Sequence, residues 1–182
     1  MVFDIYTLVE VVWILLPVYA ANGLTPIMGR YVKTHPIDMG RMLGKGRLLG
    51  DGKSWEGLFF GTLMGILVAV VEMLAFPYLP WGMSLVALNI IAMTPLVGFL
   101  LGFGAMMGDV VASFFKRRMN RPRGSPVLFL DQLDFLAGAF VMLSLAVTLE
   151  VGWIILGTIL TLVFHVVANI IAYKIGVKRN PW

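Results

Sequence analysis

The sequence predicts an all-α polytopic membrane protein with five transmembrane helices, folded as a single membrane-embedded domain over residues 1–182. The chain is 59% hydrophobic and only 13% charged, and its apolar residues form long uninterrupted runs. Runs of about 20 residues, at ~1.5 Å rise per residue, span a hydrocarbon core of ~30 Å. Such runs exclude a soluble globule and are too long for the strands of a membrane barrel.

The apolar runs place the helices at about residues 5–25, 57–77, 84–111, 127–149 and 151–173. Polar segments at about 26–56 and 112–126 follow the first and third helices. The fourth helix must include polar residues at its start, because its charge-free part, 135–149, has 15 residues and is too short to cross the bilayer. Ser125 as N-cap and Pro126 at the first helical position predict a helix from there to Leu149.

The basic residues indicate how the chain is oriented in the membrane. All fourteen Lys and Arg lie in the two polar segments and in the tail after residue 173. With five spans these three regions share one side, which the positive-inside rule assigns to the cytoplasm. We therefore expect a multi-pass cell-membrane protein with two cytoplasmic loops, a cytoplasmic C-terminus and the N-terminus outside. The N-terminal stretch agrees, since it has no basic residue before its apolar run, unlike a secretory signal peptide.

An aspartate lies near the end of the third predicted helix, where an ionisable group is costly and needs a partner. By helical spacing, Asp109 shares one face with Ser113 and with Lys116 or Arg117. An acid, a hydroxyl and cations thus line one stripe. The structural alternative is a span that ends in snorkelling basic residues, with Asp109 paired only to Ser113 or Lys116.

Two further aspartates, Asp131 and Asp134, share one face near the start of the fourth predicted helix. Adjacent carboxylates repel each other there unless a cation lies between them. The chain has no cysteine, so a metal would have oxygen and nitrogen ligands. Carboxylates favour a hard divalent cation with oxygen ligands, with Asp109 as a further candidate ligand. The alternative is that the helix dipole stabilises the acids without a metal.

The stretch GDGKSWEG, residues 50–57, resembles a phosphate-binding turn placed directly before a membrane span. It is not a P-loop, because that motif needs a glycine where the chain has Arg47. Its local chemistry still suits an anion: Lys53 carries a point charge, Ser54 can cap the second helix, and the N-terminus of that helix attracts phosphate. A helix cap with a lysine placed only by topology is the alternative.

Two other features leave a structural and a functional reading open. Asn22 lies at the end of the first helix, next to the first polar segment, where packing and ligand binding explain it equally well. Glycines recur at four-residue spacing in the second and third helices and favour close helix packing. These faces can pack within one chain or between two, which leaves a homodimer open.

The combination of S-x-x-K-R at 113–117, D-x-x-D at 131–134 and K-S-W-E-G at 53–57 resembles the CTP:phosphatidate cytidylyltransferase (CDP-diglyceride synthase) superfamily. Within that superfamily it is most similar to the archaeal CDP-archaeol synthase branch, whose short chains cover essentially this whole length. The histidine-containing segment of bacterial members is absent, and Gln132 replaces the arginine usual after the first acid. Both departures favour the archaeal branch.

The resemblance implies roles for individual residues. Asp131 and Asp134 would hold Mg²⁺ with Asp109 as a further acid, and these three with Lys116 would form the catalytic set. The S-x-x-K-R and K-S-W-E-G elements would contact CTP and its phosphates through Lys53, Ser54, Glu56, Ser113, Lys116 and Arg117. Asn22 is a further candidate for this contact from its position alone, and Mn²⁺ would suit the same acids as Mg²⁺.

The resemblance also implies a reaction. The phosphate of an isoprenoid ether lipid, unsaturated archaetidic acid (2,3-di-O-geranylgeranylglyceryl phosphate), would attack the α-phosphorus of CTP, giving CDP-archaeol and pyrophosphate. The implied partners are CTP, this lipid and the bilayer, with no nucleic acid, and the active site would face the cytoplasm. The basic loops by themselves are weak evidence for phosphate binding, because membrane topology or anionic lipid headgroups would also account for them.

Three alternative functions stay open or are disfavoured by the residues. A CDP-diacylglycerol synthase acting on diacyl phosphatidate would use the same site. A CDP-alcohol phosphotransferase is disfavoured, because its acidic motif, which begins D-G-x-x-A-R, is absent. Here Asp51-Gly52 is followed by the residues KSWE. A small ion-coupled transporter would use the aspartates as a relay, but the middle of the predicted spans has almost no paired charges.

Overall fold

The computed structural model describes residues 5–28, 31–44, 46–79, 88–121, 125, 127 and 129–174. The described chain forms α1 (Ile5–Met28), β1 (Met42–Leu43), β2 (Gly46–Arg47), α2 (Trp55–Ala75), the 3₁₀ turn η1 (Phe76–Tyr78), α3 (Pro95–Arg118), α4 (Leu130–Leu143) and α5 (Val151–Lys174). Four helices, α1, α2 with η1, α3 and α5, are long and apolar enough to cross a membrane. The mostly helical membrane class is therefore confirmed.

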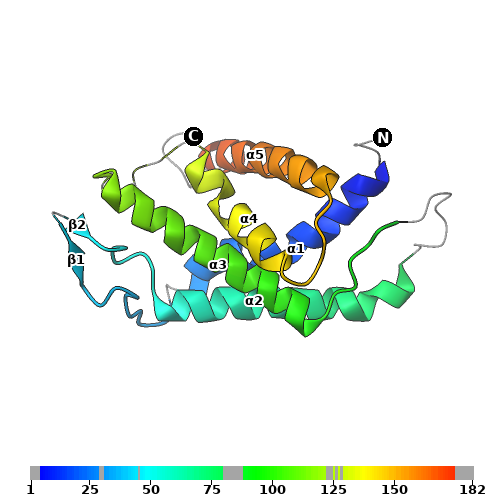
Figure 1. The fold of residues 1–182 in the computed structure, drawn as a ribbon, viewed down its shortest axis with the longest axis horizontal. Coiled ribbons are helices and arrows are strands. Elements are labelled where there is room, and N and C mark those ends of the chain that lie inside the picture. Colours follow the sequence, from blue (N-terminus) through cyan, green and yellow to red (C-terminus); the bar gives the residue numbers. More distant parts are fainter. Residues whose placement is uncertain are drawn as a thin grey trace.

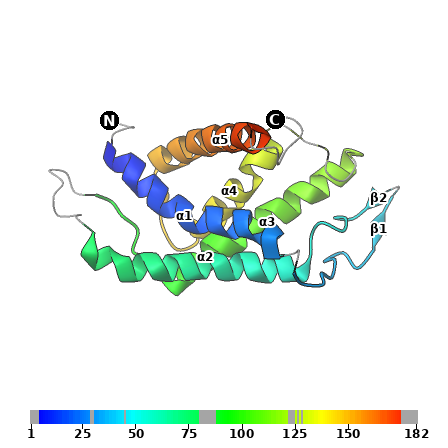
Figure 2. The same ribbon diagram turned by 180° about the vertical axis from the view of Figure 1, so that it is seen from behind.

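Helix α3 lies at the centre of the fold, packed against α1, α2 and α4, while α5 packs on α1 and α4 (Figures 1 and 2). The hairpin β1–β2 and the C-terminal end of α3 lie at one end of the molecule, at the left of Figure 1. We call this the basic end; it holds residues 31–54 and 116–121. The C-terminal end of α2 lies at the opposite end.

Glycines allow α3 to approach α4 until their backbones touch. A Cβ added to Gly108 would lie 2.0 Å from the carbonyl oxygen of Asp134, and one added to Gly138 would lie 2.2 Å from that of Gly104. On the other side of α3, a Cβ on Gly65 of α2 would lie 2.7 Å from the Cα of Gly102. The glycine faces predicted from the sequence therefore pack within one chain.

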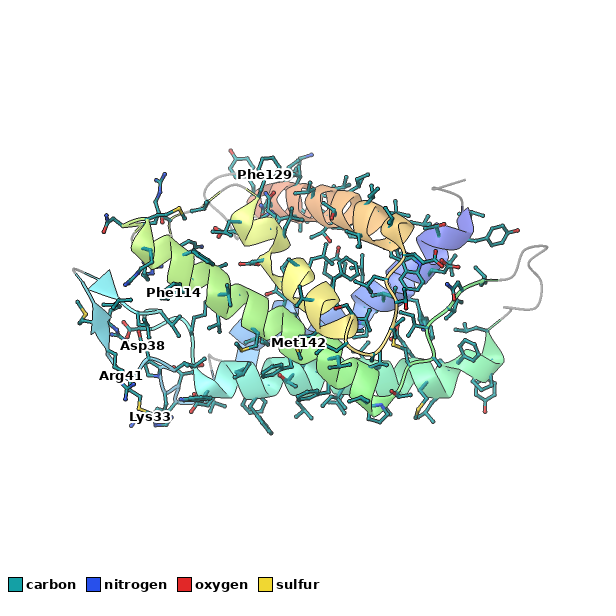
Figure 3. The ribbon with its side chains drawn as sticks, viewed as in Figure 1. Lys33, Asp38, Arg41, Phe114, Phe129 and Met142 are labelled. Atoms are coloured by element: carbon teal, nitrogen blue, oxygen red, sulfur yellow. The ribbon has the colours of Figure 1, made fainter. Side chains whose placement is uncertain are left out.

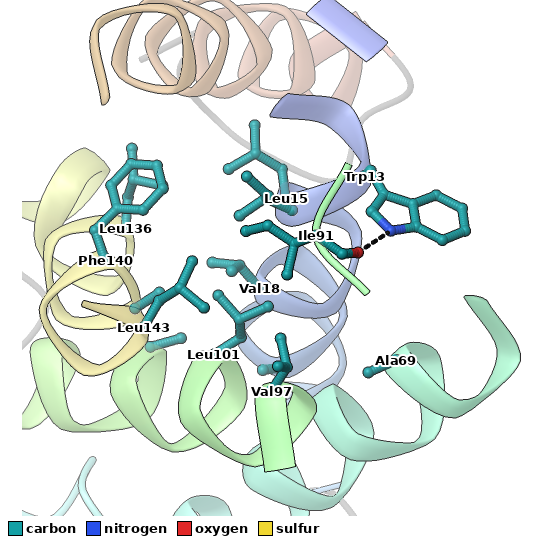
Figure 4. Close-up of a cluster of buried hydrophobic side chains, with 14 of the residues drawn as sticks. Trp13, Leu15, Val18, Ala69, Ile91, Val97, Leu101, Leu136, Phe140 and Leu143 are labelled. Carbon is teal, nitrogen blue, oxygen red and sulfur yellow. Dashed lines mark hydrogen bonds between the residues drawn. The ribbon is translucent and has the colours of Figure 1, made fainter. Parts of the chain in front are cut away.

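The apolar core lies between α1, α3 and α4 and includes Leu15, Val18, Leu101, Leu136 and Leu143 (Figure 4). Helix α3 packs closely on α2 through one set of glycines and on α4 through another, and its buried side chains fill the core between them. It therefore determines how α2 and α4 are placed relative to each other.

Irregular backbone at residues 88–94 lies against this bundle, where each polar group needs a partner. Glu10 accepts hydrogen bonds from the Asn89 amide (2.6 Å) and from Trp153 Nε1 (2.8 Å). Trp13 Nε1 donates to the Ile91 carbonyl at 3.2 Å (Figure 4). Two side chains of α1 thus supply hydrogen bonds that a helix would have made internally, and Trp153 of α5 binds the second oxygen of Glu10.

The third predicted helix, 84–111, is wrong at both ends. Helix α3 starts only at Pro95, because Thr94 caps it by accepting a hydrogen bond from the Val97 amide at 3.1 Å and Pro95 suits the first helical position. The part of the prediction at 84–87 lies outside the described residues. At the other end α3 continues to Arg118, so its last turn carries the basic cluster.

The fourth predicted helix, from Ser125 to Leu149, is also wrong. Helix α4 begins at Leu130, after Phe129 with a positive φ of 64°, and ends at Leu143. Ser125 lies in irregular backbone, and Pro126 lies outside the described residues. With 14 residues, α4 is ~21 Å long, which is shorter than a ~30 Å hydrocarbon core. Residues 144–150 reach α5 through turns and irregular backbone.

Candidate active site

Residues 35–55 form a folded ribbon at the basic end rather than an open loop. Two backbone bonds pair its arms, from the Ile37 amide to the Lys53 carbonyl (2.8 Å) and from the Trp55 amide to the His35 carbonyl (3.0 Å). The two-residue strands β1 and β2, which the sequence did not predict, close its far end. We call residues 35–54 the basic-end ribbon.

The GDGK stretch of this ribbon is a tight turn placed directly before α2. The Lys53 amide donates to the Gly50 carbonyl at 3.3 Å, and Gly50 has a φ of +92°, which favours glycine. Ser54 then caps α2 by accepting a hydrogen bond from the Gly57 amide at 3.1 Å. The predicted N-cap is confirmed, and the turn presents Lys53 to the helices.

Lys53 forms an ion pair with Asp109 of α3, and both side chains are largely buried, with 20% and 33% of their areas exposed. Next to this pair lies a pocket between α1, α2, α3 and the ribbon. It is lined by Thr25, Ile37, Gly52, Lys53, Ser54, Gly57, Leu58, Met106, Asp109 and Val110. Lysine, hydroxyl and carboxylate groups thus meet apolar side chains at one place.

A second ion pair, between Lys116 of α3 and Asp131 of α4, joins the two helices at 2.5 Å. Asp131 also accepts a hydrogen bond from the Val127 amide at 3.0 Å. Asp134 lies one turn further along α4, where it interacts electrostatically with Asp109, Lys53 and Asp131. The three predicted acids and two predicted lysines therefore lie close together, although they come from three segments of the chain.

The donor atoms at this place suit a hard divalent cation, because they are carboxylate oxygens on two closely packed helices. As arranged, no three acidic or histidine side chains of the described residues meet closely enough to hold one metal ion. Asp109 and Asp131 are bound to lysines instead. A cation would therefore take the place of ammonium groups that already neutralise these acids.

The other predicted site residues are placed as follows. Ser113 is buried on α3, one turn from Asp109. Arg117 donates from Nη1 to the Arg121 carbonyl at 2.6 Å, and its Nε lies near Gly50. Glu56 accepts hydrogen bonds from the His35 amide (2.7 Å) and ring. Asn22 is half-buried on α1 and does not line the pocket described above.

Sequence reasoning missed Asp38, a fully buried carboxylate inside the basic-end ribbon. In Figure 3, Asp38 lies within the ribbon, whereas Lys33 and Arg41 lie toward its outer edge. The Arg47 guanidinium beside Asp38 and three backbone amides hold the pKa of that carboxyl well below its usual range. The sequence does contain one sign of this role: Asp38 stands two residues before Gly40, a spacing typical of an aspartate that binds the backbone of a turn.

Comparisons with known proteins agree with this arrangement. A family model described as CarS-like, CDP-archaeol synthase, matches residues 3–182. CDP-archaeol synthases from Pyrococcus horikoshii and Thermococcus kodakarensis are 37% and 42% identical to the chain, over 96% and 93% of it and 97% and 94% of their own lengths. The relative from Halobacterium salinarum is 40% identical and covers 97% of both chains.

A solved structure described as an intramembrane enzyme for archaeal membrane lipids biosynthesis is also similar. Its TM-score is 0.71 and its sequence identity is 35%, and the match covers 89% of this chain and 94% of the other. The similarity therefore includes fold and sequence over nearly the whole length. By both measures, the chain belongs to the CDP-archaeol synthase family.

Proposed function

We propose that the protein is a CTP-dependent cytidylyltransferase that converts archaetidic acid, an isoprenoid ether-lipid phosphate, to CDP-archaeol and pyrophosphate. Membership of the CDP-archaeol synthase family over the full chain carries this proposal. The placement of Lys53, Lys116 and the three aspartates at one end of a membrane bundle supports it. The lipid's chains stay in the bilayer, and its phosphate meets water-soluble CTP at that end.

The chemistry needs charge neutralisation more than proton transfer. A phosphate monoester has a second pKa of about 6, so it is largely a dianion at neutral pH and attacks without a general base. Its oxygen forms a bond to the α-phosphorus of CTP, the bond from that phosphorus to the bridging oxygen breaks, and pyrophosphate leaves. Lys53 and Lys116 would neutralise the approaching anions. Arg117 and Ser113 flank them on α3.

Asp109, Asp131 and Asp134 are the residues that would hold Mg²⁺. When bound, a divalent cation would neutralise phosphate oxygens of CTP and the charge of the leaving pyrophosphate. The same acids, released from Lys53 and Lys116, would free both ammonium groups for phosphate. The acids would thus be neutralised by lysines before substrate binds and by the cation afterwards, while the lysines would neutralise phosphate.

We propose that the basic end faces the cytoplasm and the N-terminus lies outside. The described basic residues of the two polar segments lie at that end, as the positive-inside rule requires. Helix α4 would enter the membrane from the cytoplasmic side and the segment 144–150 would complete a fifth crossing. Backbone groups at that depth need partners, and the amides of residues 144–147 donate to carbonyls of α4.

Pyrophosphate release by the purified protein with CTP, Mg²⁺ and lipid phosphate tests this function. Wild-type protein should release pyrophosphate only with both substrates, and a chelator should abolish the release. Asp134→Asn should lower turnover by about 10³-fold without unfolding the protein, whereas Asp51→Asn, on the exposed face of the ribbon, should not. Wild-type turnover in Asp134→Asn would contradict the metal assignment.

The same assay separates the lipid classes when archaetidic and diacyl phosphates are run side by side. A higher kcat/KM for the ether lipid is expected, and a preference for the diacyl lipid would favour a CDP-diacylglycerol synthase. Absence of turnover with both lipids and several divalent ions would overturn the proposal. Solute flux in liposomes without CTP would then favour a transporter.

A further inference from the structure

The buried Asp38 carboxylate joins parts of the basic-end ribbon that lie apart in sequence. Its oxygens accept hydrogen bonds from Arg47 Nη2 at 2.5 Å and Nε at 3.2 Å, and from the amides of Gly40 (3.1 Å), Leu49 (3.0 Å) and Gly50 (2.9 Å). None of the side-chain area is exposed. Five donors on one desolvated carboxylate make it the organising group of this segment.

One of these donors, the Gly50 amide, belongs to the turn that carries Lys53. The Gly50 amide binds Asp38, and the Gly50 carbonyl accepts the Lys53 amide at the other side of the same residue. The Lys53 carbonyl in turn accepts the Ile37 amide, next to Asp38. The turn is therefore tied to Asp38 and its neighbour at both ends.

The ribbon is also fastened to α3. Arg118 donates from its guanidinium to the carbonyls of Leu43 (2.8 Å) and Arg47 (2.7 Å), and Lys53 pairs with Asp109 two turns earlier on the same helix. Arg47 thus binds Asp38 with its side chain and Arg118 with its carbonyl. Asp38 is therefore linked to α3 through the Arg47 side chain, the Arg47 carbonyl and Arg118.

We infer that Asp38 and Arg47 are positioning residues for the transfer reaction, which hold the Gly50–Lys53 turn so that the Lys53 ammonium group stays at the acids of α3. This role rests on the proposed function, since it matters for turnover only if Lys53 binds a phosphate. Misplacement of a charged group by about 1 Å can cost 10²-fold in rate. Asp38 touches neither substrate and acts through Lys53.

Asp38→Asn and Asp51→Asn are a matched pair for the test. Both acids pair with Arg47, but Asp51 lies on the exposed face of the ribbon, with 56% of its side chain exposed, and binds Arg47 at 2.8 Å. Asp38→Asn keeps the volume while placing an NH₂ group against N–H donors. We expect it to lower kcat/KM for CTP by about 100-fold, and Asp51→Asn to change it by less than about threefold.

A double-mutant cycle with Lys53→Met separates positioning from general damage. If Asp38 acts only through Lys53, adding Asp38→Asn to Lys53→Met should cause almost no further loss. Multiplication of the two losses would overturn the inference, because Asp38 would then act on the reaction by another route.

A readout without turnover uses the absence of cysteine in the chain. A single nitroxide on Met42→Cys, at an exposed position in β1, reports the mobility of the ribbon. The label should become mobile in Asp38→Asn and stay immobile in Asp51→Asn, and an immobile label in Asp38→Asn would overturn the inference. If wild-type protein shows no turnover, the proposed function fails, while this measurement still tests whether Asp38 orders the ribbon.

Discussion

The ammonium group of Lys53 and the carboxylate of Asp109 form an ion pair although they lie 56 positions apart in the sequence. The pair joins the turn before α2 to the centre of α3, and both groups are largely shielded from solvent. A charge-assisted contact in such surroundings is stronger than a surface ion pair. It brings the Gly50–Lys53 turn and the acids of α3 and α4 to one place.

Lys53→Met should raise KM for CTP or lower kcat, and should reduce kcat/KM by about 10²–10³-fold, because a charge that neutralises phosphate is lost. The measurement is pyrophosphate release over a range of CTP concentrations. Lys33→Met, which removes an exposed lysine on the same side of the molecule, is the control and should change kcat/KM little. Equal losses in both variants would mean that only the net charge of the basic end matters.

Gly108→Ala should weaken the contact between α3 and α4. The added methyl group would overlap the Asp134 carbonyl, so α4 must move away and carry Asp131 and Asp134 with it. Overpacking of this kind costs about 1–3 kcal/mol, and we expect a lower thermal unfolding midpoint together with reduced turnover. Gly23→Ala is the control, because nothing lies within 4 Å of a Cβ at Gly23. A Gly108→Ala protein with wild-type stability would contradict the observed approach of the helices.

Glu10 and Glu72 are both buried, with 6% and 4% of their areas exposed, but in the described part of the chain only Glu10 has hydrogen-bond partners. Among the described residues, both carboxylate oxygens of Glu72 lack a hydrogen bond. Glu72→Met should therefore raise the free energy of unfolding by about 1–3 kcal/mol, whereas Glu10→Met should lower it by at least as much, because it leaves the Asn89 amide and Trp153 Nε1 without an acceptor. Thermal unfolding in detergent measures both. Destabilisation by Glu72→Met would mean that this carboxyl has a partner in the membrane-embedded protein.

Features that depend on a few neighbouring residues were predictable from the sequence. The apolar runs located α1, α2 and α5 to within a few residues, and the Ser54 cap follows from its place before a helix. The grouping of Asp109, Asp131 and Lys116 followed from helical spacing and from the family resemblance. The ion pairs Lys53–Asp109 and Lys116–Asp131 could not be predicted, because the sequence does not show which lysine contacts which acid on a neighbouring helix.

Features set by distant contacts were missed or wrong. Residues 88–94 are apolar enough to continue a helix, but a hydrogen bond from the Asn89 amide to Glu10 and one from Trp13 to the Ile91 carbonyl favour extended backbone there. Helix α4 starts later than Ser125 and Pro126 suggest, and ends at Leu143 although apolar residues continue beyond it. The sequence does not distinguish Asp38 from an ordinary acidic residue of a loop, because its five hydrogen-bond donors come together only when the ribbon folds.

Order in the basic-end ribbon should depend on pH through Asp38. Because Arg47 and the surrounding amides lower the pKa of Asp38 in the folded ribbon, its carboxylate stabilises the fold at every pH above the ordinary aspartate value of about 3.9. This stabilisation decreases as the pH falls below that value, and it is lost as the pH falls through the lowered pKa of the folded ribbon, where Asp38 takes up a proton. A nitroxide on Met42→Cys should therefore stay immobile from neutral pH down to about pH 4 and become mobile in more acidic solution. Asp51 pairs with the same arginine at 2.8 Å, so it is a second acid that the titration has to distinguish from Asp38. The titration is therefore repeated with Asp51→Asn, which should keep the transition, and with Asp38→Asn, whose label should be mobile throughout; an unchanged transition in Asp38→Asn would assign it to another acid.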